Sequence, residues 1–378
     1  MGGSLPGVDT GPTRRLRHAV IGAGAGILKA HLPALLSEGV DLVAVTDVNE
    51  EPARSRAAQL GCDFYPDHRD MLAARRPEVC VILAPQPFHA GIALDCLKAG
   101  SHVLVEKPMA VRLDDADAMI EASREAGRLL AVNFQQRFRP EVRAAKRLIE
   151  DGELGEIQRV TMTHYWTRPA AYYATAPWRA VAAMEGGGLL MNQASHDLDL
   201  LCHLLGMPER VVAWTGTVLH AVEVEDTVQA MLRWSAGVFG SFYSSTAGAG
   251  EEPNLVIYGT AGRLQVFEDR LVFERFEVDL ERYAATEADP FGPPPPLEPV
   301  QVELEAGQHG HLPVYHDLHE AILQGSPLTV DGAEGRKSLE LANAMLYSDL
   351  IGEEVSLPLD RSTYASMLEE LRAARELA

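Results

Sequence analysis

Residues 18–26 read HAVIGAGAG, an apolar run followed at once by three closely spaced glycines. The run predicts a β-strand, and Gly22, Gly24 and Gly26 would let the backbone turn sharply and approach a pyrophosphate. A helix beginning after the turn would offer its free N–H groups to that anion. The usual spacing is G-x-G-x-x-G, and Ile27 occupies the place of the third glycine. The motif alone is therefore also compatible with a plain tight turn.

An acidic residue further along supports the dinucleotide interpretation. Asp47 ends a second apolar run, about 20 residues beyond the turn, where a carboxylate hydrogen-bonds the 2′-hydroxyl of a ribose. A carboxylate there repels a 2′-phosphate, so the sequence favours NAD over NADP. The alternative is an aspartate that only caps the following helix.

Short apolar runs and helical stretches alternate along residues 17–138. The runs are nearly continuous in apolar residues, which is typical of parallel strands covered on both faces. This alternation predicts an α/β domain with a doubly wound parallel sheet, the Rossmann architecture. The expected strands are 18–21, 41–46, 79–84, 102–105 and 129–134, and the expected helices are 28–37, 51–59, 88–98 and 114–126.

The pattern changes after Pro140, and residues 139–378 are expected to form a second, α+β domain. Its longer β segments and hairpin-type turns predict a large, mostly antiparallel open sheet with helices on one face. The expected strands are 157–166, 211–219, 227–234, 238–244, 255–258 and 263–267, and the expected helices are 140–151, 189–205, 313–324 and 336–350. Residues 289–299 contain six prolines and are interpreted as a loop, which cannot be a central strand. Because an open sheet face must be covered, we expect an oligomer.

Length and charge narrow the class of protein. A chain of 378 residues suggests two domains. A net charge of −21 argues against binding to nucleic acid or to anionic membrane surfaces. The chain has no apolar run long enough to span a membrane. The four cysteines form no C-x-x-C pair and are interpreted as mostly buried thiols.

The first sixteen residues are interpreted as a disordered tail. Arg14 and Arg15 are typical of one kind of export signal, but no extended apolar stretch follows them. We therefore expect a cytoplasmic protein.

Three further segments carry a resemblance to a known family. They are APQPFH at residues 84–89, GSHVLVEKP at residues 100–108 and EGGGLLMNQASHDLD at residues 185–199. Together they make the chain resemble the glucose–fructose oxidoreductase / inositol dehydrogenase / rhizopine catabolism (Gfo/Idh/MocA) oxidoreductases. The similarity extends from about residue 17 to residue 350. The Glu-Lys-Pro element after its strand is the most specific part.

The resemblance implies roles for individual residues. The lysine of Glu-Lys-Pro, here Lys107, would lie beside the nicotinamide and the reacting hydroxyl, and its bond to the proline is commonly cis in the family. The catalytic histidine would be His196, and the family's usual aspartate four residues before it is Asn192 here. Some branches of the family carry Asn-Gln at this place. The residues implied on the cofactor side are Pro85, Gln86, His89, Glu106, Gln135 and Arg179.

The residue types support this chemistry without the family. Lys107 ends a strand of an open α/β sheet, where ligands bind, and its charge can lower the pKa of a hydroxyl. On a helix over 189–205, the polar residues Asn192, His196, Asp199 and His203 would form one stripe on an otherwise apolar surface. Asp199 could orient His196, which could accept a hydroxyl proton. Asn192 could only orient, because an amide does not shuttle protons. A buried structural histidine is the alternative, and no metal is expected because the spacing matches no zinc pattern.

Aromatic and basic residues indicate the substrate side. A cluster after the first strand of the second domain fits a cleft that stacks sugar faces and bonds hydroxyls, with sheet and loop packing as the alternative. Residues at the domain junction are a further candidate wall of the cleft. The candidate substrate residues are Lys107, Arg137, Trp166, Tyr172, Arg179, Asn192, His196 and His311, and the other junction residues are Asn133, Gln135, Gln136 and Arg139.

We therefore predict an NAD-dependent dehydrogenase that acts on a secondary CH–OH group of a sugar, polyol or glycoside, in a homodimer or homotetramer. One alternative is a glycosidase that uses bound NAD for transient oxidation and releases no NADH. Another is a non-catalytic sensor that binds a dinucleotide, against which the presence of both Lys107 and His196 argues.

Overall fold

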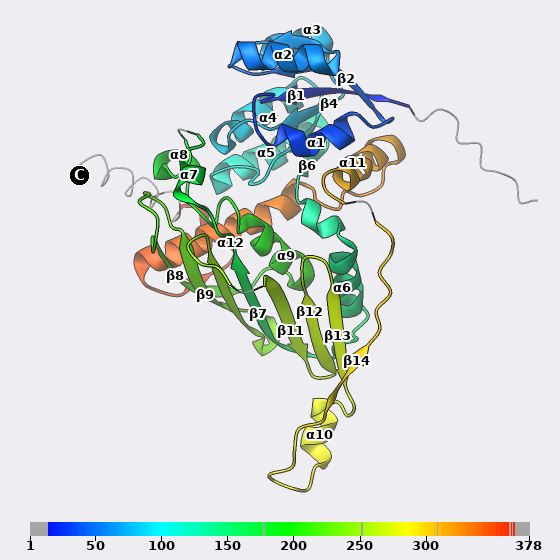
Figure 1. Ribbon diagram of the computed structural model, residues 1–378, viewed down its shortest axis with the longest axis vertical. Coiled ribbons are helices and arrows are strands. Elements are labelled where there is room, and N and C mark those ends of the chain that lie inside the picture. Colours follow the sequence, from blue (N-terminus) through cyan, green and yellow to red (C-terminus); the bar gives the residue numbers. More distant parts are fainter. Residues whose placement is uncertain are drawn as a thin grey trace, which may run out of the picture.

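The computed structural model describes residues 14–362 except residues 177, 251 and 308, together with residues 364 and 366. Most of the predicted tail, residues 1–16, lies outside this range, and Leu16 already belongs to the first strand. Figure 1 shows an N-terminal sheet above a larger C-terminal sheet, with helices between them. No helix in the described part of the chain is both long and apolar enough to cross a membrane.

The N-terminal sheet is parallel throughout and has the strand order β3-β2-β1-β4-β5-β6. Its strands are β1 (Leu16–Ile21), β2 (Val40–Thr46), β3 (Asp63–Tyr65), β4 (Val79–Ile82), β5 (His102–Val105) and β6 (Leu130–Val132). Its helices are α1 (Leu28–Leu35), α2 (Glu50–Leu60), α3 (His68–Arg75), α4 (His89–Lys98) and α5 (Leu113–Ala126), with a 3₁₀ turn η1 (Gln86–Phe88). The order reverses between β1 and β4, which opens a crevice at the carboxyl ends of these strands. The predicted doubly wound sheet is confirmed, although β3 and α3 were not expected.

The C-terminal sheet has nine strands in the order β14-β13-β12-β11-β7-β10-β9-β8-β15. They are β7 (Ile157–Tyr165), β8 (Arg210–Gly216), β9 (Thr227–Arg233), β10 (Phe239–Ser245), β11 (Asn254–Gly259), β12 (Gly262–Val266), β13 (Leu271–Phe276), β14 (Leu297–Val300) and β15 (Val355–Ser356). All neighbours are antiparallel except β7 and β10. The predicted mostly antiparallel sheet is therefore confirmed.

Further helices follow β6 along the chain; most of them lie between the two sheets, and α10 lies apart from both (Figure 1). They are α6 (Pro140–Glu150), α7 (Ala170–Tyr173), α8 (Ala182–Glu185), α9 (Ser195–Leu205), α10 (Leu280–Thr286), α11 (Leu312–Gln324) and α12 (Gly332–Ile351), with the 3₁₀ turns η2 (Gln135–Phe138) and η3 (Ser235–Gly237). Helix α12 lies between the two sheets and α11 lies beside α1 (Figure 1). One continuous cluster of buried side chains includes Val105 of β5, Leu341 of α12 and Leu232 of β9, so the two sheets share a core.

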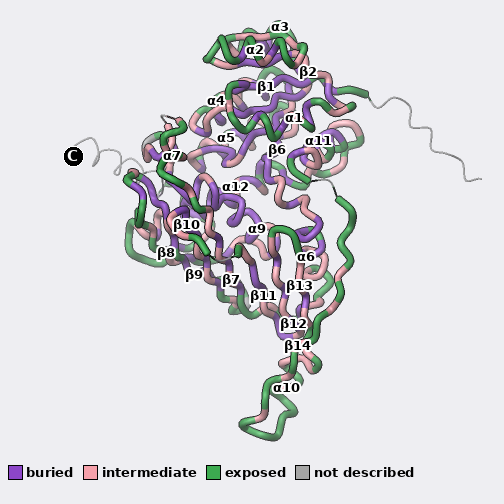
Figure 2. Tube along the Cα trace, viewed as in Figure 1, coloured by how far each residue is buried: buried purple, intermediate pink, exposed green. Residues whose placement is uncertain are grey.

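The opposite face of the C-terminal sheet is open. Strand β9 alternates buried and exposed residues, as expected for a sheet with one covered face. Trp214, Met231 and Phe239 are large apolar side chains that stay exposed on β8, β9 and β10. Figure 2 also shows an exposed arm around α10, at the end of the molecule distant from the N-terminal sheet.

Two expected elements differ from the structure. The proline-rich loop expected over 289–299 ends in strand β14, which contains Pro299 and lies at the edge of the sheet, where a missing N–H is tolerated. The helix expected over 189–205 begins only at Ser195. The segment 189–194 forms turns, because Glu225 engages the backbone N–H groups of Leu189 and Leu190 through its carbonyl and carboxylate oxygens.

Candidate active site

The glycine turn joins β1 to α1 at the crevice of the N-terminal sheet. Gly22 has φ +97°, and a Cβ added there would lie 2.5 Å from the Ala84 nitrogen, so only glycine fits between β1 and β4. A Cβ on Gly26 would meet nothing within 4 Å. In the described part of the chain, the N–H groups of Gly26 and Ile27 have no hydrogen-bond partner. Two free donors at a helix N-terminus, opening onto unfilled space, fit the pyrophosphate of a dinucleotide.

Asp47 follows β2 and faces this turn. Its Oδ2 accepts the N–H of Gly24 at 2.7 Å, and its Oδ1 accepts the N–H of Asn49, the residue before α2, at 2.8 Å. The carboxylate thus helps to organise both loops, but it does not cap α2, which has no side-chain cap hydrogen bond. An ionised carboxylate has about four acceptor positions, so capacity remains for a ribose hydroxyl.

The segment after β4 joins the two halves of the crevice. The Gln86 amide donates to the backbone oxygen of Glu185, which belongs to the C-terminal domain, at 3.0 Å. The two ring nitrogens of His89 lie 2.9 and 2.7 Å from the backbone oxygens of Pro108 and Ala84. The His89 ring therefore ties the end of β4 to the segment after β5. Pro85 lies after β4 and immediately before η1.

Lys107 reaches from the end of β5 to the C-terminal domain. The Lys107–Pro108 peptide bond is cis, as the family resemblance implied. The Lys107 Nζ donates to the backbone oxygen of Asn192 at 2.6 Å. Burial lowers the pKa of Lys107, and the charge of Glu106 partly offsets this effect. The structure therefore brings together a desolvated cation and the segment that leads to His196.

His196 is a buried imidazole at the start of α9. Its Nδ1 has no hydrogen-bond partner among the described residues. The ring makes an edge contact with Phe134 and lies 6.4 Å from the Trp166 ring, centroid to centroid. Burial and the nearby positive charge of Lys107 hold the pKa of His196 well below its ordinary value. The ring is therefore neutral at pH 7 and able to accept a proton.

Asn192 is held by a buried carboxylate. Its Nδ2 donates to Glu185 Oε1 at 2.9 Å, and Glu185 Oε2 accepts the N–H of Ala180 at 2.6 Å. Burial raises the pKa of Glu185. Glu185 therefore links Gln86, Asn192 and the residue after Arg179.

A pocket opens beside His196, between the sheet and helix α9. The junction residues Gln136 and Arg139 are among the residues that line it. Its lining residues are Gln136, Arg139, Met162, Thr163, His164, Trp166, His196, Asp197, Leu200, Pro253, Asn254, Leu255, Val266, Phe267 and Glu268.

One wall of this pocket is an aromatic platform fixed by a carboxylate. The rings of Trp166 and His164 stack at 3.9 Å. Asp197 Oδ2 accepts the Trp166 indole N–H at 2.8 Å, and its Oδ1 lies 2.9 Å from His164 Nδ1. The platform offers a flat face next to the candidate base, which suits a sugar ring.

A second aromatic group lies around Arg179. The Arg179 guanidinium packs over the rings of Tyr172 and Trp178, at 4.3 and 4.8 Å from their centroids. It also donates to the Tyr172 hydroxyl. Together with burial, the charge of Arg179 lowers the pKa of Lys107, so the two cations lie close enough to influence each other.

Two expectations about the polar stripe and one about Arg137 were wrong. Asp199 does not orient His196, because its carboxylate pairs with Arg137 through contacts of 2.8 to 3.1 Å. Arg137 also donates to Glu334 at 3.0 Å, and its side chain is 1% exposed. Its guanidinium is thus used inside the protein, which contradicts the expected substrate contact. Asn192 does not share a helical stripe with His196, because it precedes α9.

Other predicted residues lie around the site rather than in the pocket. His311 packs against His31 with 4.3 Å between ring centroids and faces Glu106, on the α1 side of the N-terminal sheet. It is absent from the pocket wall. Gln135 follows β6, and its buried Oε1 has no partner in the described chain.

Sequence reasoning missed His164, Asp197 and Glu185. Asp197 is adjacent to His196, and Glu185 stands directly before the glycine triplet. Either carboxylate could have been noticed as a buried acid beside a catalytic candidate. His164 gave no signal, because it is one of several polar residues in β7 and such residues have many structural uses.

Comparison with known families agrees with this geometry. Residues 16–134 match the oxidoreductase family with an NAD-binding Rossmann fold, and residues 142–265 match the GFO/IDH/MocA C-terminal domain.

Individual relatives cover most of the chain. The WlbA dehydrogenase from Bordetella pertussis, solved in complex with NADH and UDP-GlcNAcA, is 31% identical. The match has a TM-score of 0.79 and covers 92% of this chain and 99% of that one. Myo-inositol 2-dehydrogenase of Thermotoga maritima is 26% identical over 343 residues, which are 87% of this chain and 95% of the relative. Levoglucosan dehydrogenase of Pseudarthrobacter phenanthrenivorans is 27% identical over 353 residues, which are 83% and 89% of the two chains. With its parallel dinucleotide sheet, its Glu-Lys-Pro lysine and its buried histidine, this chain belongs to the GFO/IDH/MocA family of oxidoreductases.

Proposed function

We propose that the protein transfers hydride between NAD and a secondary hydroxyl of a sugar, polyol or glycoside bound beside His196. The observation that carries this proposal is the convergence of Lys107, from the dinucleotide sheet, with the Asn192–His196 segment, from the pocket-bearing domain. The dehydrogenase activities of the inositol and levoglucosan relatives support a polyhydroxylated substrate.

NAD, when bound, would supply the hydride acceptor, and the chain's own residues would transfer the proton. The neutral His196 imidazole accepts the hydroxyl proton as the carbon-bound hydrogen leaves with its electron pair, and the substrate carbon becomes a carbonyl carbon. The positive charge of Lys107 stabilises the developing alkoxide oxygen. The reverse direction uses the same groups, with His196 returning the proton.

Glu185 and Asn192 would position this pair. The family's usual aspartate is replaced by Asn192, whose amide donates to the Glu185 carboxylate. The negative charge thus lies one hydrogen bond further from the reacting centre than an aspartate at position 192 would place it. Asn192 also holds Lys107 through its backbone oxygen, so it acts as a positioning residue.

The cofactor preference is proposed to be NAD. Asp47 presents a carboxylate at the glycine turn, and this charge would repel a 2′-phosphate. Gly22, Gly24, Gly26 and Ile27 form the turn under the pyrophosphate. We propose Pro85, Gln86, Glu106, Gln135 and Arg179 as further cofactor-side residues, and Tyr172 and Trp166 as substrate-side residues.

We also propose a homodimer or homotetramer. Exposed Trp214, Met231 and Phe239 lie on three neighbouring strands of the open face. Apolar surface of this kind marks association in many proteins.

The test is turnover. Purified protein is mixed with NAD and a panel of sugars, polyols and glycosides, and NADH absorbance is followed. We expect NADH formation with at least one of them, and Lys107→Ala and His196→Ala to lower kcat/KM by about 10²–10⁴-fold, the range for a positioned acid–base group. Undiminished activity in both variants would exclude this site assignment.

The same experiment separates the two rival functions. Glycoside cleavage without net NADH release would indicate the NAD-dependent glycosidase. Cofactor binding without turnover of any panel member would favour the sensor.

A further inference from the structure

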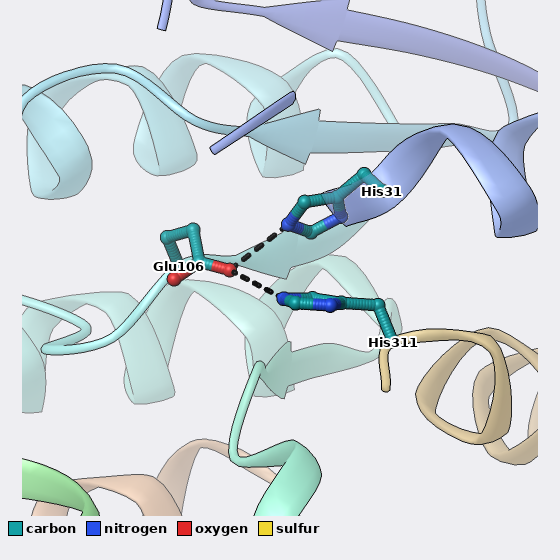
Figure 3. Close-up of side chains that lie close together, drawn as sticks. All are labelled: His31, Glu106 and His311. Atoms are coloured by element: carbon teal, nitrogen blue, oxygen red, sulfur yellow. Dashed lines mark hydrogen bonds and ion pairs between the residues drawn. The ribbon is translucent and has the colours of Figure 1, made fainter. Parts of the chain in front are cut away.

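Three buried side chains from distant parts of the sequence meet behind the Glu-Lys-Pro segment (Figure 3). His31 comes from α1, Glu106 follows β5, and His311 immediately precedes α11. Their nearest nitrogen and oxygen atoms all lie within 4.8 Å of one another. The His31 and His311 Nε2 atoms are 3.0 and 3.8 Å from Glu106 Oε1. Hydride transfer in the proposed mechanism gives neither histidine a role.

These separations match those of ligands around one small cation. Zinc holds imidazole nitrogens and carboxylate oxygens at about 2.0–2.2 Å in tetrahedral geometry, which places neighbouring ligand atoms about 3.3–3.5 Å apart. The two measured distances lie on either side of that value. The third separation, between the two imidazole rings' ligand atoms, is at most 4.8 Å, so a bound ion would draw the two rings closer together. Two histidines and one glutamate also form a known catalytic-type zinc ligand set, with a fourth position for water.

The surrounding residues orient the ligands as metal sites require. The Tyr315 hydroxyl lies 2.9 Å from His31 Nδ1 and leaves Nε2 directed at Glu106. The Asn133 amide donates to Glu106 Oε1. Such partners fix the ring and the carboxylate around a metal and raise its affinity.

His311 is the member whose position lacks another explanation. It is 8% exposed, yet within the described residues its ring nitrogens make no hydrogen bond. Its ring nitrogens are therefore available to a ligand or to water. Its Nε2 is aimed at the carboxylate that His31 already faces.

We propose that His31, Glu106 and His311 form a binding site for one divalent transition-metal ion of the zinc class, separate from the substrate pocket. The ion would link α1, the end of β5 and the start of α11. Soft thiolate ligands are absent from the set, and a mixed imidazole–carboxylate set suits Zn²⁺, Co²⁺ and Ni²⁺ better than Mg²⁺ or Ca²⁺.

The experiment measures metal binding directly. Full-length protein is treated with a chelator, exchanged into buffer without it, and titrated with ZnCl₂ by calorimetry, with MgCl₂ as a comparison. We expect one saturable Zn²⁺ site per chain and no comparable Mg²⁺ binding. Co²⁺ should give the intense visible absorption of four-coordinate cobalt, which a solvated surface ion lacks.

Variants identify the ligands. His311→Gln should weaken Zn²⁺ binding at least 100-fold, and it is the mildest ligand change because the ring makes no hydrogen bond in the described chain. Tyr315→Phe keeps all three ligands and should weaken binding about 10–100-fold by removing the partner of His31. His316→Gln is the matched control on the same helix α11, exposed and outside the cluster, and should bind as the unaltered protein does. Circular dichroism establishes that each variant is folded.

Two results would overturn the proposal. The first is the absence of a saturable Zn²⁺ site in the chelator-treated protein. The second is a site whose affinity is the same in folded His311→Gln and in the His316→Gln control, which would place the ion elsewhere. Both readouts are independent of turnover, so a failed dehydrogenase assignment would not affect them.

Discussion

At the scale of single residues, the proposed chemistry depends on two groups whose ionisation is shifted by burial. The pKa of His196 lies well below its ordinary value because of burial and the Lys107 charge. The pKa of Lys107 lies below its ordinary value because of burial. Both shifts move the groups toward their uncharged forms. The base is therefore available at neutral pH, and the cation is easier to neutralise than an exposed lysine.

These directions predict the pH profile of hydroxyl oxidation. Protonation of His196 removes the base, so kcat/KM should fall on the acid side only below pH 6.5. Loss of the Lys107 charge should lower kcat/KM on the alkaline side, with a midpoint below 10.5, its ordinary pKa. Lys107→Arg keeps a charge that does not titrate in this range, so its residual activity should lack the alkaline limb. An acid midpoint at 7 or above, or an unchanged alkaline limb in Lys107→Arg, would contradict these roles.

Asp47 predicts the choice of cofactor. Asp47→Asn keeps an oxygen for the Gly24 N–H but removes the charge. The ratio of kcat/KM for NAD to that for NADP should fall about 10–100-fold, since a hydrogen bond to a charged group contributes about 1.5–3 kcal/mol. The ratio cancels general damage to the loop. Gly61→Ala, at a left-handed helix end remote from the turn, serves as a control for damage and should leave the ratio unchanged.

At the scale of elements, the chain uses buried ion pairs to fix where η2, α9 and α12 meet. Arg137 of η2 pairs with Asp199 of α9 and Glu334 of α12. The arginine and Asp199 are almost fully buried, so each depends on its partner for compensation of lost hydration. His196 stands one turn before Asp199. The pair therefore holds the helix that carries the candidate base.

Breaking this pair should destabilise the protein strongly. Arg137→Met leaves the Asp199 carboxylate buried and uncompensated, so we expect a loss of about 3–5 kcal/mol in the free energy of unfolding, measured by urea denaturation. Arg137→Met with Asp199→Leu removes both charges and should recover a large part of the loss. A single variant costing less than about 1 kcal/mol, or a double variant no more stable than the single, would contradict the inference.

At the scale of the whole molecule, local signals predicted most of the architecture. Long apolar runs and glycine-terminated helices identified most of the parallel sheet, and regular hairpin spacing identified much of the second one. The three-residue strand β3 was missed because so short a segment carries no periodic pattern. The helix expected from residue 189 failed because Glu225, 36 residues further on, binds the backbone of Leu189. Because such partners are distant in the sequence, no local pattern predicts them.

The candidate site shows the same contrast between residues in local motifs and residues whose partners are distant in the sequence. Lys107 and His196 could be named as candidates because each belongs to a motif. Arg137 was assigned to the substrate because a conspicuous arginine near a strand end gives no sign of its distant partners, Asp199 and Glu334. The His31–Glu106–His311 cluster combines three segments that only the fold brings together. Contacts between segments so far apart in the sequence form only in the folded molecule.

The return of α11 to the N-terminal sheet has a consequence for biosynthesis. Tyr315 and Leu318 of α11 share a buried cluster with Leu28 and Leu35 of α1. A ribosome releases residues 312–324 only after β7 to β14 of the C-terminal sheet have been made. Until then, the nascent dinucleotide-binding sheet keeps part of its apolar surface in water and lacks the ring of His311 behind Glu106. The N-terminal sheet is therefore completed only after most of the C-terminal sheet has been synthesised, because α11 supplies part of its cover.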